Sequence, residues 1–197
     1  LGDIRMSYLF KKKDWMPECP WKPRGRAVVE IKLLNPENAE HVAQVKALSR
    51  DLSVVSRFYV DERFRPHVAD MYSIWAGNLM KPKASTDLPV VTVVALVGDQ
   101  VVGFIGNKIV EEEVNGKNIR HGEVVLVATH PEFRGHGIGR AMTGTSIDWC
   151  FENGTEFVTV DTQGNNYQAS RLYENVGFRL REMILIYHVW KQYGFNK

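Results

Sequence analysis

The sequence predicts an α+β fold in which a mixed, mostly antiparallel sheet carries helices on both faces. Two β-branched runs at residues 90–97 and 101–110 are joined by the turn Gly98-Asp99-Gln100, which is the strongest hairpin signal in the chain. An apolar run at residues 124–128 leads through a glycine-rich turn into a pattern of helical period. The full order of expected elements, β-α-α-β-β-β-α-β-α-β, suits one sheet covered by helices on both sides.

The first 26 residues are basic, aromatic and interrupted by Pro17, Pro20 and Pro23. Because proline disrupts helices and cannot donate to a strand ladder, we expect neither a long helix nor a central strand here. We therefore interpret residues 1–26 as a basic, Pro-rich extension that wraps over a core at 27–191, within a single domain spanning 1–197. Residues 27–34 alternate well enough to form the first strand.

Two helices are expected before the hairpin. Asn35 and Pro36 suit an N-cap and a first helical position, so a helix should run from about 36 to 51. After a loop-like stretch at 53–59, Pro66 is placed to open a second helix, and 81–89 is read as a linker. The apolar faces of the two helices are expected to be Val42, Val45, Leu48 and Leu52, then Val68, Met71, Tyr72, Trp75 and Leu79.

The second half of the chain alternates strands and helices. Residues 111–122 are interpreted as a charged turn before the strand at 124–128. The helix after the glycines should end near Asn153-Gly154, and a short buried strand follows at 157–161. Asn165-Asn166 should cap the next helix, which ends at Gly177, and 178–190 supplies the last strands.

The glycine-rich turn predicts an anion site. Between Arg134 and Gly139 every second residue is glycine, and the helix begins as the glycines end. The first amides of a helix have no intrahelical acceptor, and the helix dipole adds positive potential, so a diphosphate is the natural ligand. A P-loop is excluded because Arg140-Ala141, not Lys and Ser or Thr, follows the last glycine. The G-x-G-x-G spacing also does not fit a dinucleotide fingerprint.

Two motifs resemble those of the GNAT acetyltransferase superfamily. The run Arg134-Gly-His-Gly-Ile-Gly139 is similar to its R/Q-x-x-G-x-G/A signature, and residues 166–178 are similar to its second signature, N-x-x-A-x-x-L-Y-x-x-x-G-F. The resemblance implies the acyl-CoA N-acyltransferase fold and binding of acetyl-CoA, with no metal. It implies that a strand edge pairs with the pantetheine arm and that the glycine turn holds the pyrophosphate. The implied cofactor residues are Val127, Ala128, Thr129, Arg134, Gly135, His136, Gly137, Ile138, Gly139, Arg140 and Asn166.

The resemblance also implies catalytic roles. Tyr173 occupies the position of the family tyrosine beside the coenzyme sulfur and is the candidate general acid, although an ordinary phenol is less acidic than a thiol. Glu123, at the start of the strand, is the candidate base, with His121 and His130 as alternatives. An ordinary carboxylate is a weak base at neutral pH, so this role needs burial. Each of these residues also has a purely structural reading, as a core aromatic, an edge carboxylate or a passive loop histidine.

The acceptor is expected to be a primary amine of a small molecule. A narrower resemblance, carried by 162–166, 171–173, 56–58 and 186–190, is to bacterial acetyltransferases of TDP-fucosamine, a nucleotide-linked amino sugar. Arg57, Phe58 and Tyr59 are the candidate acceptor residues, although packing explains the aromatic pair as well. A protein lysine or N-terminal amine, and an acyl-CoA sensor without turnover, remain as alternatives.

The amino-acid composition limits the classes of ligand and the cellular compartment that we expect. A formal net charge of +2 gives no overall field that favours nucleic acid or a membrane surface, although seven basic residues lie between Arg5 and Arg26. Two cysteines are too few for a disulfide scaffold, no apolar run approaches the length of a membrane span, and no metal-ligand spacing accompanies the histidines. We expect a cytoplasmic protein without metal; its oligomeric state, with a homodimer as one option, is left open.

Overall fold

In this computed structural model, the described residues are 3–16, 22–24, 28–81 and 88–187. One seven-stranded sheet has the order β2-β3-β4-β5-β6-β1-β7. Its pairs are antiparallel except for β5 with β6, which is parallel. The strands are β1 (Asp3–Lys11), β2 (Glu30–Leu33), β3 (Val90–Val97), β4 (Gln100–Val114), β5 (Lys117–Thr129), β6 (Phe157–Gln163) and β7 (Arg179–Ile186).

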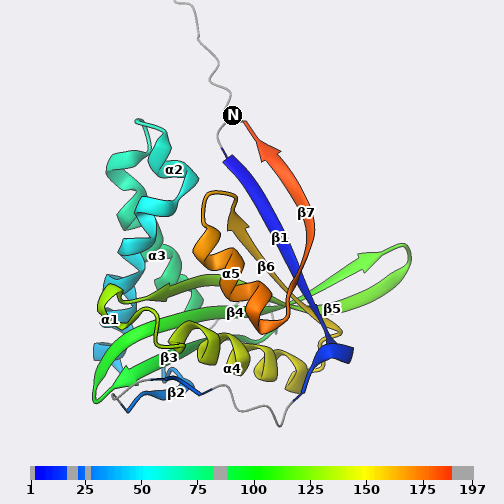
Figure 1. Cartoon of the computed structure of the whole chain (residues 1–197), viewed down its shortest axis with the longest axis horizontal. Coiled ribbons are helices and arrows are strands. Elements are labelled where there is room, and N and C mark those ends of the chain that lie inside the picture. Colours follow the sequence, from blue (N-terminus) through cyan, green and yellow to red (C-terminus); the bar gives the residue numbers. More distant parts are fainter. Residues whose placement is uncertain (1–2, 17–21, 25–27, 82–87, 188–197) are drawn as a thin grey trace, which may run out of the picture.

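Helices cover both faces of the sheet. The α-helices are α1 (Ala39–Ser49), α2 (Arg57–Val60), α3 (Val68–Leu79), α4 (Ile138–Glu152) and α5 (Tyr167–Val176). One core cluster joins α4 and α5 to the sheet through residues such as Met142, Ile147 and Tyr173. A second cluster joins α1 and α3 to the opposite face through residues such as Val45 and Tyr72. The predicted fold class is therefore confirmed (Figure 1).

Elements defined by local signals lie where the sequence predicts them. β3 and β4 form the expected hairpin, and α4 ends at Glu152 with Asn153 as its C-cap. α5 begins after Asn166, whose side chain accepts a hydrogen bond from the Ala169 amide at 3.2 Å. Gly177 ends this helix in the left-handed conformation. These boundaries follow from turn and cap chemistry acting over a few residues.

Three local predictions need correction. α1 begins at Ala39 and its cap is Asn38, whose side chain accepts from the His41 amide at 3.0 Å, so the helix starts later than Asn35-Pro36 indicated. The stretch 53–59 is not only a loop, because α2 begins at Arg57. The charged stretch 111–122 is not a turn: β4 and β5 continue through it to a tight turn in which Asn115 and Gly116 have φ of 53° and 75°.

The prediction that residues 1–26 hold no central strand is wrong. β1 lies between β6 and β7 and pairs antiparallel with both. Its side chains alternate: Tyr8 and Phe10 are buried in the core beneath α4 and α5, whereas Arg5 and Ser7 face the other side near Asp161. The hydrophobic core therefore includes part of the segment that the sequence assigned to an extension.

Phe10→Ala should destabilise the fold if β1 is part of the core. The Phe10 ring packs against the rings of Phe151 and Phe178, with centroids 6.1 and 5.4 Å away. Truncating a buried phenylalanine typically costs about 3–5 kcal/mol of unfolding free energy. Urea denaturation would measure this loss, with Lys11→Ala at the exposed next position as the control. Equal stability of the two variants would contradict a core role for β1.

Some predictions fall outside the described residues. These are residues 1–2, 17–21 and 25–26 of the predicted extension, the start of the first strand at 27, most of the linker, at 82–87, and the end of the last strand segment, at 188–190. β7 itself ends at Ile186. Within the described ranges, none of the helices has both the length and the apolarity needed to cross a membrane.

The sheet separates into two halves where β5 meets β6. Their parallel pairing covers three residue pairs, from Gly122–Val158 to Val124–Val160. Val125 is then an extra residue in the β4–β5 register, since Gly106 pairs with Leu126 and Asn107 with Val124. Such a bulge bends a strand, and β5 turns away from β6 beyond it. Figure 1 shows the two halves diverging, with α5 in the angle between them.

Candidate active site

A cavity of about 730 Å³ occupies the angle between the two halves of the sheet. The diverging parts of β5 and β6 form two walls, and α5 and the glycine turn contribute to it. Its remaining wall carries aromatic side chains from α2 and α3, namely Phe58, Tyr72 and Trp75. The cavity therefore connects the predicted cofactor motif with the helices of the opposite face.

The β5 wall offers a strand edge that β6 does not use. Val127, Ala128 and Thr129 pair with β4 on one side, but the β5–β6 register ends at Val124. An extended ligand can hydrogen-bond to such an edge as an added strand. The Thr129 carbonyl accepts a hydrogen bond from Arg134 Nε at 3.1 Å, which fixes the strand end to the turn that follows.

The glycine turn has backbone geometry that glycine permits. Gly135 and Gly137 have φ of 79° and 77°, and Gly137 is the N-cap of α4. A side chain is strained at such angles, whereas glycine adopts them readily. At Gly139 a Cβ would lie 3.3 Å from Leu172 Cδ2, so glycine also lets α4 approach α5. The first residues of α4 line the cavity, and the first amides of a helix have no intrahelical acceptor, so the arrangement fits a diphosphate.

Nearly all predicted cofactor residues line this one cavity. His136 is the exception among the described residues, because its carbonyl accepts from the Arg24 amide at 2.6 Å and its ring bonds the Arg134 carbonyl at 2.9 Å. Asn166 lines the cavity while its side-chain oxygen caps α5. The others that line it are Val127, Ala128, Thr129, Arg134, Gly135, Gly137, Ile138, Gly139 and Arg140.

Tyr173 lies at the cavity wall on α5 and is almost fully buried, with 3% of its surface exposed. Its ring packs against Tyr8 and Phe178, with centroids 5.9 and 5.8 Å away. Burial raises the pKa of Tyr173 above its ordinary value near 10, and the charge of Asp161 raises it further. The phenol therefore keeps its proton at physiological pH.

Of the three candidate bases, only Glu123 is among the residues that line the cavity in the described structure. Its carboxylate pairs with Lys108 Nζ at 2.9 Å across the β4–β5 ladder. His121 is instead buried against the Phe157 ring, with centroids 5.0 Å apart, and burial lowers its pKa. His130 packs edge-on against Phe133. The geometry thus favours Glu123 over either histidine.

The predicted acceptor residues divide in a similar way. Arg57 and Phe58 line the cavity, and Phe58 also packs edge-on against Phe64 with centroids 5.8 Å apart. Phe58 therefore packs against a neighbouring aromatic ring and also lines the cavity, and its contact with an acceptor stays a prediction. Tyr59 is not brought to the described cavity wall: it is 38% exposed and the guanidinium of Arg65 lies over its ring.

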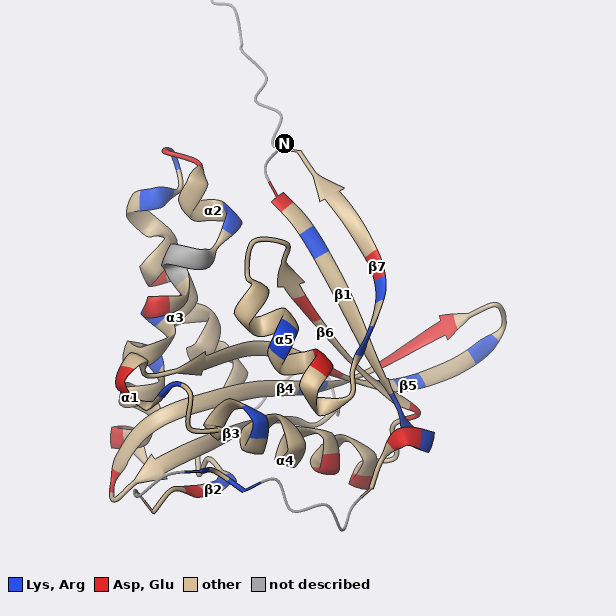
Figure 2. Cartoon of the chain, in the orientation of Figure 1, with Lys and Arg blue, Asp and Glu red and all other residues tan. Residues whose placement is uncertain are grey.

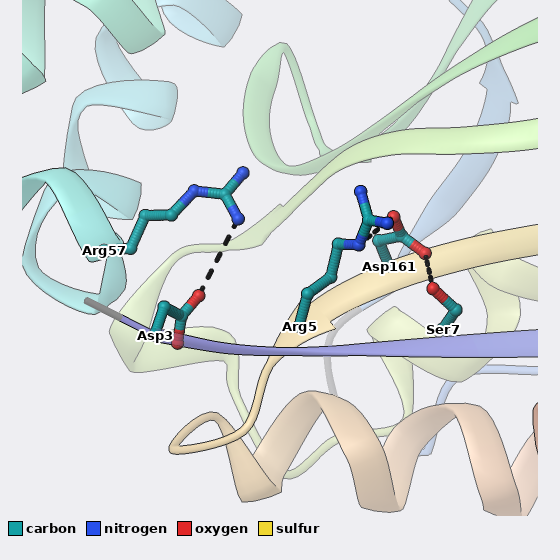
Figure 3. A network of polar contacts seen from close by, with 5 residues as sticks. All are labelled: Asp3, Arg5, Ser7, Arg57 and Asp161. Atoms are coloured by element: carbon teal, nitrogen blue, oxygen red, sulfur yellow. Dashed lines mark hydrogen bonds and ion pairs between the residues drawn. The ribbon is translucent and has the colours of Figure 1, made fainter. Parts of the chain in front are cut away.

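Sequence reasoning did not assign Arg5 or Asp161 to the site, but both line the cavity. Figure 2 shows basic residues on α2 and charges of both signs on β1. Ser7 Oγ donates to Asp161 Oδ1 at 2.6 Å, and Arg5 Nε lies 3.5 Å from Asp161 Oδ2 (Figure 3). The alternation of polar and apolar residues along 3–8 was the available signal, and it was outweighed by the prolines further along.

Comparison with known proteins gives a family match. A protein-family model described as "Acetyltransferase (GNAT) family" matches residues 52–178. The spore coat polysaccharide biosynthesis protein SpsD of Bacillus subtilis (strain 168) is 25% identical over 158 residues, which cover 80% of this chain and 50% of that protein. N-alpha-acetyltransferase 30 of Schizosaccharomyces pombe is 31% identical over 90 residues, or 46% of this chain and 58% of that protein. The chain thus spans about half the length of these relatives.

Solved structures share the fold at low identity. The aminoglycoside N-acetyltransferase AAC(6')-Iy in complex with CoA aligns with a TM-score of 0.59 and 19% identity, covering 85% of this chain and 98% of that one. A ribosomal-protein-alanine N-acetyltransferase from Brucella melitensis aligns with a TM-score of 0.54 and 19% identity, covering 86% and 99%. At this identity the similarity concerns the fold alone.

Proposed function

The chain belongs to the GNAT acetyltransferase family, and from this premise we propose that it transfers the acetyl group of acetyl-CoA to a primary amine of a small molecule. One observation carries the proposal. The unpaired β5 edge, the glycine turn, Tyr173 and Glu123 all line a single cavity, although they come from separate parts of the chain. Pantetheine along β5 and diphosphate on the turn would direct the thioester toward the point where β5 and β6 separate.

The proposed chemistry is direct attack without a covalent enzyme intermediate. The amine lone pair attacks the thioester carbonyl carbon and the C–S bond breaks. The nitrogen gives up one proton to the base, and the departing thiolate takes up one proton from solvent, so that the amide and free CoA thiol result. A backbone amide of β5 would stabilise the developing oxyanion. Because its pKa is raised, Tyr173 would act chiefly by donating a hydrogen bond to the leaving sulfur. Glu123 would take the amine proton, directly or through water.

Glu123→Gln should lower kcat by about 100-fold or more, as expected on removal of a general base. The Lys108→Met variant is the matched control, because it breaks the same ion pair but keeps the carboxylate. We expect Lys108→Met to retain most of its turnover in a steady-state assay. If the two variants lose turnover equally, the ion pair rather than the carboxylate matters and Glu123 is not the base.

For the acceptor, we favour an amino sugar, in particular a nucleotide-linked one. Support comes from the short sequence resemblance, from a relative named for polysaccharide biosynthesis, and from the aromatic wall suited to stacking on rings. A peptide N-terminus is the second candidate, because other relatives are N-alpha-acetyltransferases. The cytoplasmic location and the absence of nucleic-acid partners stay predictions.

Two measurements test the function. Calorimetric titration with acetyl-CoA should give saturable binding, and a thiol-release assay should detect turnover over a panel of amino sugars, their nucleotide derivatives, polyamines and peptides. Turnover confined to peptides would favour the second candidate. Saturable binding without any thiol release above hydrolysis would favour an acyl-CoA sensor, and absence of binding would remove the basis of the proposal.

A further inference from the structure

We propose that Arg5 and Arg57 form an anion-binding subsite in the outer part of the cavity, and that the accepted amine carries a phosphate or carboxylate group that binds there. This inference rests on the proposed function, because it concerns the acceptor that meets acetyl-CoA. Both arginines line the cavity, although one comes from the sheet and the other from α2. Figure 3 shows them on the same side of β1.

The register of β1 sets the depth of each charge. β6 stops pairing with β5 after Val160, and the next residue, Asp161, faces Ser7 of β1. At about 3.3 Å per residue, Arg5 and Asp3 begin about 7 and 13 Å further out along β1 than Ser7. Asp161 therefore lies close to the point where the strands separate, and Arg57 lies further out beside Asp3. The Arg5 side chain starts further out along β1 and reaches back to within 3.5 Å of Asp161, so it lies between the two.

The sign of the charge changes along this wall. Near the strand separation, Glu123 and Asp161 line the cavity beside their cationic partners Lys108 and Arg5, and their remaining acceptor positions suit a positively charged amine. Further out, Arg5 and Arg57 suit a negative group. An acceptor with an ammonium at one end and an oxyanion at the other matches both regions. A polycationic acceptor would instead bring ammonium groups against the arginines, and like charges at short range repel.

Each arginine lies near one carboxylate and has further N–H donors that can bind a ligand. Arg57 Nη1 lies 3.9 Å from Asp3 Oδ2, and the side chains are 27% and 8% exposed, so the carboxylate is the deeper partner. Arg5 Nε is buried and lies 3.5 Å from Asp161 Oδ2, yet it makes no hydrogen bond within the described part of the chain. A guanidinium has five N–H donors, and each of these contacts involves one nitrogen at long range.

A purely structural role for the two ion pairs is the competing explanation. Their distances exceed the 2.7–2.9 Å or so of a strong charge-assisted hydrogen bond. The Arg5–Asp161 pair is also exposed, and exposed ion pairs contribute little to stability. An oxyanion that meets a guanidinium with two parallel hydrogen bonds binds more strongly than the carboxylates do in this geometry. The neighbouring wall of Phe58, Tyr72 and Trp75 is aromatic, and a charge interaction is stronger beside such groups than in open water.

Anion binding to the CoA complex tests the proposal. The protein is first saturated with CoA, which occupies the glycine turn, and is then titrated by calorimetry with pyrophosphate or with malonate. At least one anion should bind saturably with 1:1 stoichiometry. Arg5→Gln and Arg57→Gln should each weaken that binding at least about tenfold, the loss expected for one hydrogen bond to a charged group. Arg63→Gln, a cation of the α2 region outside the described cavity wall, should leave it unchanged.

The outcomes are separable. Binding of pyrophosphate alone identifies a phosphorylated acceptor, and binding of malonate alone identifies a carboxylated one. If neither anion binds, or if the arginine variants bind as the wild type does, the subsite is wrong. CoA affinity and thermal unfolding of each variant show whether it is folded and still holds the cofactor. Intact CoA binding and turnover beside a failed anion titration would leave the proposed function standing.

Discussion

Tyr173→Phe should lower kcat between about 10-fold and 100-fold while the Kd for acetyl-CoA stays within about threefold. The phenol of the wild-type protein is buried at the cavity wall, where its hydroxyl would donate a hydrogen bond to the developing thiolate. The substitution removes this donor. Hydrogen bonds to charged groups contribute about 1.5–3 kcal/mol, which corresponds to this range of rates. Stopped-flow thiol release and calorimetry would measure the two quantities separately.

Tyr167→Phe is the matched control for this variant. Tyr167 lies on the same helix but is 65% exposed, so removal of its hydroxyl should leave kcat unchanged. Because burial raises the pKa of Tyr173 above 10, ionisation of the phenol should not limit kcat up to about pH 9. The wild type and Tyr173→Phe should therefore share the same pH profile below that value. Unchanged turnover in Tyr173→Phe would remove the assigned role.

The sequence predicted those parts of the fold and site that depend on neighbouring residues. The turn at Gly98-Asp99-Gln100, the cap at Asn166 and the left-handed C-cap at Gly177 each act within a few positions. The glycine turn is likewise a contiguous motif, and the structure brings most of its residues to one cavity. Motifs whose residues are neighbours in the sequence can therefore be predicted without knowledge of the tertiary structure.

The missed elements depend on partners that are distant in sequence. Ser7 pairs with Asp161, more than 150 positions away, so the alternation along residues 3–8 can suggest a strand but cannot show that the strand is central. The far ends of β4 and β5 were not recognised as strands for another reason, namely their charged composition. Residues 111–118 are exposed on both faces, so burial does not impose the alternation by which strands are recognised.

The part of the cavity that we propose for the acceptor was the least predictable. Arg5 and Asp161 face it only because β1 inserts between β6 and β7, and Tyr72 was predicted as an apolar core residue of its helix. That prediction is confirmed by the burial of Tyr72, yet the same side chain lines the cavity. When one side chain both packs in the core and lines the cavity, the sequence shows only the apolar pattern of the core and gives no separate signal for the cavity.

Gly137→Val should weaken acetyl-CoA binding by about 100-fold or more, which tests the cradle that the proposed function requires. Gly137 has a φ of 77° at the N-cap of α4, and its nearest neighbours beyond the turn would be at least 3.7 Å from a new Cβ. The expected loss of affinity therefore comes from a strained backbone conformation at residue 137 and not from a steric clash of the new side chain. A β-branched residue avoids this φ, so the turn would reorganise and its amides would no longer converge on one diphosphate.

Gly116→Val separates this local effect from general destabilisation. Gly116 has a φ of 75° with open space around its Cβ position, and it lies in the β4–β5 turn, outside the described cavity wall. Both variants should lose a similar free energy of unfolding, on the order of 1–2 kcal/mol for a left-handed residue. Only Gly137→Val should lose coenzyme affinity in calorimetry. Equal affinities would mean that the phosphates do not bind at the α4 N-terminus, because the same backbone strain would then have no consequence at the turn proposed to hold them.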